Sequence, residues 1–160
     1  MLLKLRKRMA REESGFTLVE LLVVMLIIGL LAAIAIPAFF NQRDKSYDAN
    51  AKEQARTAET AMETYATDNG GLYTSATSGA LVTIENSLSD TVSTTRPYIS
   101  GVTVTGSGVN AGKGYTVTIT SPKTSNTFTI GRDAATSQLT FTCSTGGTAG
   151  CPSNGTWAQG

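Results

Sequence analysis

The chain has 160 residues, which suffices for one modest globular domain and one extended helix but not for two large cores. Thirteen lysines and arginines face twelve aspartates and glutamates, and this balance gives no support to nucleic-acid binding through a broad basic face. The chain has no histidine, the commonest general base and transition-metal ligand. We therefore expect no catalytic residues, no metal site and no cofactor.

The charges are unevenly distributed along the chain. The first 15 residues contain five basic and two acidic side chains, so the rest carries eight basic and ten acidic ones, a net charge of −2. Because basic flanks of an apolar helix remain in the cytoplasm, we expect the amino terminus to face the cytoplasm.

An apolar run separates Glu20 from Arg43, with no charged residue between them. At ~1.5 Å per residue its 22 residues span roughly 33 Å, close to the ~30 Å hydrocarbon layer of a bilayer. Glu20 is unusual, because an acidic side chain in a spanning segment costs up to about 3 kcal/mol and normally has a partner. No lysine or arginine within the run can serve as that partner.

The sequence GFTLVE at residues 15–20, with a basic segment before it and an apolar helix after it, resembles the prepilin class of the type IV filament superfamily. The resemblance implies that a membrane peptidase cuts between Gly15 and Phe16 and that the new terminus is N-methylated. It also implies an assembly role for Glu20. The close likeness covers residues 1–40 and is one of architecture beyond them.

We expect one helix over residues 16–68, with a membrane-spanning half at 16–40 and an amphipathic half within 41–69. Gly29 and Pro37 stand where many type IV pilins have a glycine and a helix-bending proline, so a bend is expected near Pro37. Asp48 and Lys52 lie four residues apart in the favourable order, which adds a small stabilising term of roughly 0.3 kcal/mol. An apolar stripe at helical spacing marks the face that packs inward: Tyr47, Ala51, Ala55, Ala58, Met62 and Tyr65.

Two-residue alternation in the carboxy-terminal region predicts antiparallel strands around 115–119, 128–130 and 139–143, each with one buried face and one threonine-rich face. A further strand is expected at 99–104, although Gly101 weakens it. The connection at 70–97 has no clear period, and residues 81–84 are its candidate for a short strand. Packing this sheet on the helix stripe would complete both cores. The predicted fold class is therefore α+β, a long helix against a small antiparallel head at 98–160.

The two cysteines, Cys143 and Cys151, are expected to form a disulfide in an exported domain, worth roughly 2.5 kcal/mol. Two unbonded thiols remain the alternative. Glu59 and Glu63 lie four residues apart on the helix and are most simply explained by a solvated face. Trp157 could pack under the tail or remain exposed.

The expected function is structural: a major type IV pilin, made as a single-pass inner-membrane precursor and assembled into an extracellular homo-oligomeric filament. Its expected partners are the prepilin peptidase and methyltransferase, an inner-membrane assembly platform and membrane lipid. One alternative is a pseudopilin of a secretion or DNA-uptake machine. Another is an uncleaved, membrane-anchored binding protein. An ordinary signal peptide cleaved after the apolar run is a further reading.

Overall fold

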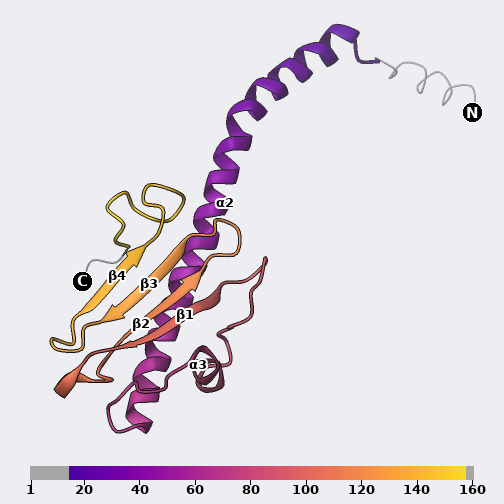
Figure 1. Cartoon of the computed structure of the whole chain (residues 1–160). Helices are drawn as coiled ribbons and strands as arrows, with labels where there is room; N and C mark the ends of the chain where they lie inside the picture. Colours follow the sequence, from indigo (N-terminus) through magenta and orange to yellow (C-terminus); the bar gives the residue numbers. More distant parts are fainter. Residues whose placement is uncertain (1–14, 158–160) are drawn as a thin grey trace, which may run out of the picture. The chain divides into compact units, whose positions relative to one another are not determined.

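The structure is a computed structural model that describes residues 15–157, so most of the predicted leader at 1–15 lies outside the described residues. The chain divides into two compact units, 1–40 and 41–160, of which we call the second the globular unit. Figure 1 shows the elements. They are helix α2 (Leu18–Asp68), helix α3 (Ser78–Ile84), strand β1 (Tyr98–Thr105), the 3₁₀ turn η1 (Gly108–Asn110), and strands β2 (Gly114–Thr120), β3 (Thr127–Arg132) and β4 (Leu139–Cys143).

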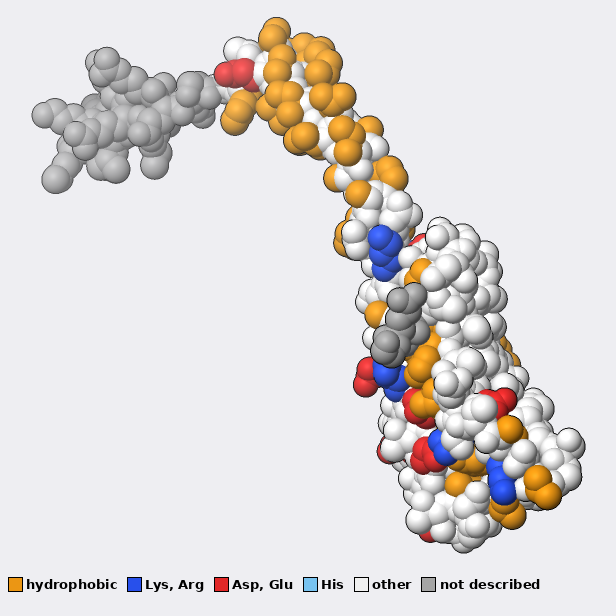
Figure 2. Space-filling model, turned by 90° about the vertical axis from the view of Figure 1, so that its left-hand side faces the viewer, with side chains coloured by type: hydrophobic (Ala, Val, Ile, Leu, Met, Phe, Trp, Pro, Cys, Tyr) orange, Lys and Arg blue, Asp and Glu red, His pale blue; other side chains and the backbone are white. Residues whose placement is uncertain are grey.

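The first unit contains the apolar half of α2. The helix begins at Leu18, two residues later than the sequence analysis expected. None of residues 15–40 is buried, and one 18-residue window of the helix has a mean hydropathy of 2.9. Figure 2 shows this surface covered by hydrophobic side chains. By length and composition alone, this part of α2 could cross a membrane.

The second half of α2 supplies one wall of the core of the globular unit. Alanines dominate its buried face, with Met62 as the largest apolar side chain. Tyr47 and Tyr65, at the two ends of the predicted stripe, are half-buried. Small side chains let a sheet approach the helix backbone closely, so the pattern predicted for this face is confirmed at its centre.

The four strands form one antiparallel sheet in the order β1-β2-β3-β4, each strand pairing with the next along the chain. The three strands predicted from alternation and the further strand expected at 99–104 are therefore all present. The register of β1 against β2 shifts between Ile99 and Gly101, the position that weakened the prediction. An extra residue at this point bends the strand without ending the pairing.

The inward side chains of β2 and β3 pack against the α2 face in a single cluster. Tyr115, Val117, Ile119, Phe128 and Ile130 all have no exposed surface. Strand β4 lies at the edge of the sheet and is more open, with Leu139 37% exposed. The helix and the sheet thus bury each other's apolar faces, as the α+β prediction required.

The prediction of a short strand at 81–84 was wrong, because these residues belong to helix α3. Thr77 caps the helix by accepting a hydrogen bond from the Ala80 amide at 3.2 Å, and Leu81 is fully buried. A short apolar run flanked by polar residues fits either a strand or a helix turn by periodicity. The threonine cap and the single buried leucine select the helix.

Candidate functional site

Glu20, the isolated acid of the apolar segment, lies in the first turn of α2. Its carboxylate accepts hydrogen bonds from the Thr17 amide and hydroxyl at 2.9 and 2.8 Å, and its own amide donates to the Thr17 hydroxyl at 3.3 Å. This reciprocal arrangement is a capping box. Within residues 15–157 the carboxylate's partners come from Thr17, so no basic side chain there neutralises it.

The other residues singled out in the apolar segment lie within the same helix. Pro37 is inside α2, and a side chain added at Gly29 would meet no atom within 4 Å. The bend predicted near Pro37 stays a prediction.

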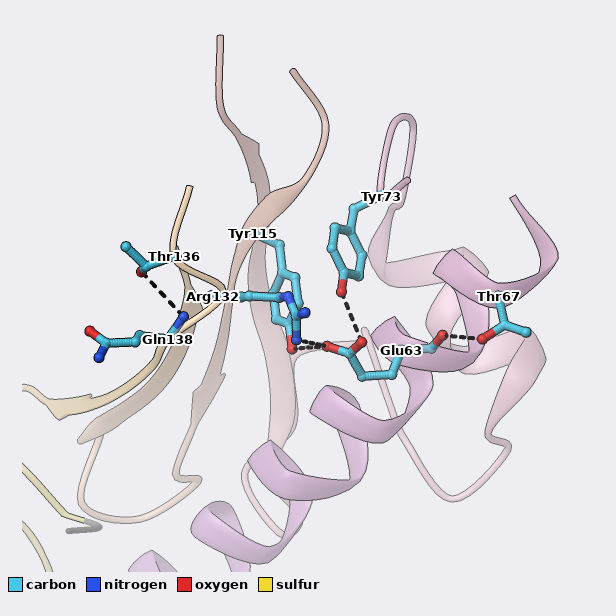
Figure 3. A network of polar contacts seen from close by, with 7 residues as sticks. All are labelled: Glu63, Thr67, Tyr73, Tyr115, Arg132, Thr136 and Gln138. Atoms are coloured by element: carbon cyan, nitrogen blue, oxygen red, sulfur yellow. Dashed lines mark hydrogen bonds and ion pairs between the residues drawn. The ribbon is translucent and has the colours of Figure 1, made fainter. Parts of the chain in front are cut away.

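Glu63 organises a polar cluster on the globular unit, shown in Figure 3. Its carboxylate accepts hydrogen bonds from the hydroxyls of Tyr73 and Tyr115 at 2.9 and 3.2 Å and pairs with the Arg132 guanidinium at 3.1 Å. The cluster joins α2 to the connecting segment, β2 and β3. The explanation of Glu63 by a solvated face was therefore incomplete, because 42% of its side chain is exposed but its carboxylate also binds three distant residues. Its partners lie at least ten residues away in sequence, so helical spacing could not reveal them.

From the two tyrosines of this cluster we predict that the globular unit unfolds at alkaline pH. Burial, and next the Glu63 carboxylate, raise the pKa of Tyr73 to about 12, and burial raises the pKa of Tyr115 as well. Because the folded state holds these protons more tightly, the stabilisation is complete below pH 10 and is lost as the pH rises through about 12. We expect tyrosinate absorbance to show two tyrosines ionising together with the loss of circular dichroism. Ionisation of both near pH 10 in the folded protein would contradict this.

Asp48 is the second polar centre and the largest departure from the sequence analysis. Asp48 is completely buried, and besides the expected attraction to Lys52 it makes contacts with distant segments that the sequence analysis did not foresee. Its carboxylate accepts hydrogen bonds from the Thr124 hydroxyl, from the Asn126 amide group at 2.8 Å and from the Gly150 backbone N–H at 2.8 Å. It therefore connects α2 to the β2–β3 turn and to the carboxy-terminal tail. We call this set of contacts the Asp48 cluster.

Lys52 reinforces the same connection from the next turn of α2. Its ammonium donates to the Gly150 carbonyl at 2.6 Å. Burial lowers the pKa of this lysine, and the charge of Asp48 partly opposes that shift. A Cβ at Gly150 would lie 2.5 Å from the Asp48 Cβ, so the tail approaches the helix too closely for any larger residue at this position.

The predicted disulfide is confirmed: Cys143, the last residue of β4, is bonded to Cys151, with 5.9 Å between the two Cα atoms. We call residues 143–151 the tail loop. Cys151 is buried, and its carbonyl accepts a hydrogen bond from the Gly147 amide at 3.0 Å. The disulfide thus holds the tail loop where Gly150 contacts Asp48.

Trp157, which the sequence left undecided, is half-buried beyond the tail loop. Its indole packs edge-on against Phe141 and Phe128, with ring centroids 5.2 and 5.9 Å apart, and its N–H donates to the Thr142 carbonyl at 2.9 Å. The Arg56 guanidinium lies 5.5 Å from the indole. The tail is therefore packed against the β4 edge.

Comparison with known proteins gives one family match. A family described as the prokaryotic N-terminal methylation motif matches residues 10–36. This range contains the 15–20 sequence and most of the apolar segment. No solved structure matches the chain significantly.

Several relatives align with part of the chain. Type II secretion system core protein G of Pseudomonas aeruginosa is 37% identical over 37% of this chain and 42% of its own length. Type IV major pilin protein PilA of Myxococcus xanthus is 43% identical over 34% of this chain and 24% of its own. Fimbrial protein EcpC of Eikenella corrodens is 32% identical over 61% of this chain and 58% of its own.

The chain thus spans less than two thirds of the length of each of these relatives. Three observations point to the same kind of protein. They are the match to the methylation motif, the similarity to both pilins and pseudopilins, and the long helix packed on a four-stranded antiparallel sheet. Proteins of this kind are structural and are not enzymes. The chain carries the prokaryotic N-terminal methylation motif and is similar both to type IV pilins and to pseudopilins.

Proposed function

We propose that this chain is the major subunit of a type IV pilus. The observation that carries the proposal is the GFTLVE sequence at the start of an exposed apolar helix, with one acid left without a basic partner in the described residues. Exposed apolar surface of this extent needs a lipid or protein environment. A membrane before assembly, and the bundled helices of other subunits after it, would provide both environments in turn.

The precursor would insert with its amino terminus in the cytoplasm and its globular unit beyond the inner membrane. Prepilin peptidase would cut between Gly15 and Phe16, and a methyltransferase would modify the new terminus. An inner-membrane assembly platform would then move the apolar helices from lipid into the filament. In this arrangement the bend at Gly29 and Pro37 would help the helices to pack.

The charge of Glu20 would then set the position of each subunit. Cleavage creates a free amine at Phe16, four residues before Glu20 in the sequence. A buried carboxylate is strongly unfavourable alone, but the Phe16 amine of a neighbouring subunit would neutralise it at one axial offset. The Thr17 capping contacts leave the carboxylate with further capacity to accept hydrogen bonds. Incorrect offsets would leave the acid unpaired and are therefore disfavoured.

Intact-mass measurement of the protein from cells tests the processing step. We expect a polypeptide that begins at Phe16 and carries one added methyl group. A mass that includes residues 1–15 would instead support an uncleaved membrane-anchored binding protein. A start after the apolar run would support an ordinary signal peptide.

A pseudopilin is the second candidate, because protein G of a type II secretion system is among the relatives. Sheared cell-surface material separates the two. Long filaments composed mainly of this chain support a major pilin. Absence of such filaments, combined with correct cleavage at Phe16, supports a short pseudopilus in a secretion or DNA-uptake system.

A further inference from the structure

A recess in the globular unit has no part in the functions proposed above. Its volume is about 700 Å³, within the roughly 300–1,000 Å³ of small-molecule sites. Helix α2 contributes Asn41, Asp44 and Lys45, the β2–β3 turn contributes Thr124 and Asn126, and the tail loop contributes Thr145, Gly147, Thr148 and Ala149. Three segments far apart in sequence therefore build one polar site.

One wall of the recess is held by a buried residue, Asn126. Asn126 is 2% exposed, and its amide group donates to Asp48 at 2.8 Å and to the Thr148 carbonyl at 3.4 Å. Thr145 and Ala149, both on the wall, adopt positive φ angles of 61° and 47°. Non-glycine residues in this conformation are uncommon and cluster at binding sites. The recess is thus formed partly by residues whose positions are fixed by hydrogen bonds and backbone conformation.

The charges at the recess have both signs. Within residues 15–157, the side chains of Asp44 and Lys45 make no hydrogen bond or ion pair. Asp44 and Lys45 are the charged residues in the lining of the recess, and they have opposite signs. The lining as a whole therefore favours neither an anion nor a cation. A zwitterion, which brings one charge of each sign, can pair with both the half-buried Asp44 and the exposed Lys45.

The position of the recess along the chain points to a lipid. Asp44 and Lys45 follow Phe40, the last residue of the apolar segment, by four and five residues. At ~1.5 Å per residue this is about 6–8 Å of helix. The headgroup layer outside the hydrocarbon is roughly 5–8 Å thick on each side. In a membrane-inserted subunit, these charges therefore fall at the depth of the headgroups.

We propose that this recess binds the phosphoethanolamine headgroup of a membrane phospholipid. The Lys45 ammonium contacts the phosphate, and the Asp44 carboxylate accepts hydrogen bonds from the primary ammonium. The quaternary ammonium of phosphatidylcholine has no N–H to donate, and the recess has no aromatic side chain to bind it instead. Phosphatidylglycerol would leave Asp44 without a cation. The proposal rests on the membrane insertion described under the proposed function.

Lipid retention tests the headgroup site. The full chain is reconstituted in vesicles with equal parts phosphatidylethanolamine, phosphatidylcholine and phosphatidylglycerol, then extracted in mild detergent for mass spectrometry of the bound lipid. We expect phosphatidylethanolamine to be retained about tenfold over the other two lipids. Lys45→Gln and Asp44→Asn should each remove most of this preference. Lys113→Gln and Asp90→Asn change exposed charges outside the recess and should leave it unchanged.

Several outcomes would contradict the proposal. Equal retention of phosphatidylglycerol, or the same preference in the Lys45 and Asp44 variants, overturns the proposal. Binding of soluble phosphoethanolamine as tightly as the lipid would make the ligand a free metabolite and overturns the lipid assignment. Vesicle flotation separates the underlying ideas. A chain that does not float contradicts membrane insertion itself, whereas one that floats without the lipid preference contradicts the headgroup site alone.

Discussion

Glu20→Ala is expected to leave the chain in the inner membrane but to reduce sheared filaments by at least about tenfold. The alanine removes the charge that would pair with the Phe16 amine of the neighbouring subunit. Membrane insertion should persist, because the substitution makes the apolar segment more hydrophobic. Filament yield is measured by quantifying the chain in sheared and membrane fractions.

Two matched variants separate charge from helix capping. Glu20→Gln keeps the side-chain shape and an oxygen that can accept the Thr17 bonds, but it cannot neutralise an amine. We expect it to fail as Glu20→Ala does. Thr17→Val removes the capping hydroxyl and keeps the acid, so it should still form filaments. Normal filament yield from Glu20→Gln would refute the pairing role.

Asp48→Ala is expected to destabilise the globular unit by about 3 kcal/mol, which lowers the melting temperature by on the order of 10 °C. The substitution removes the acceptor for the Thr124 hydroxyl and the Gly150 N–H, and it leaves the buried Asn126 amide group with only its long bond to the Thr148 carbonyl. Unpaired buried donors cost more than the hydrogen bonds themselves contribute. Thermal unfolding of the full chain in detergent, followed by circular dichroism, measures the change.

The disulfide should determine how much Asp48 contributes to the free energy of unfolding. In a Cys143→Ser, Cys151→Ser background the tail loop is no longer closed, so the Gly150 amide is not held at the carboxylate. Asp48→Ala should then cost about 1–2 kcal/mol less than in the oxidised protein. Additivity of the two changes would show that the disulfide acts independently of the Asp48 cluster.

Glu63→Gln provides the control for this double-mutant cycle. Glu63 lies 15 residues beyond Asp48, about 22 Å along α2, and its contacts are with Tyr73, Tyr115 and Arg132. Its effect should therefore add to that of cysteine removal within about 0.5 kcal/mol. Coupling as large as that of Asp48 would indicate a general loss of structure.

Local patterns made the strands and the buried helix face predictable. Threonine alternation located β2, β3 and β4, because successive side chains of a strand point to opposite faces. Alanines at helical spacing located the buried face of α2, because residues three and four positions apart lie on the same side of a helix. The pattern failed at 81–84, where four residues fit either period and the capping contact of Thr77 decided for a helix.

By itself, the sequence determined the apolar helix, the 15–20 motif and the family likeness, because these depend on residue order and on hydrophobicity along one segment. The tertiary structure alone decided what Asp48 and Glu63 do. Both acids occupy ordinary helix positions in the sequence, and their partners come from strands and turns up to 102 residues away. A contact between distant segments leaves no spacing in the chain, so only folding could show that Asp48 joins the helix to the tail loop.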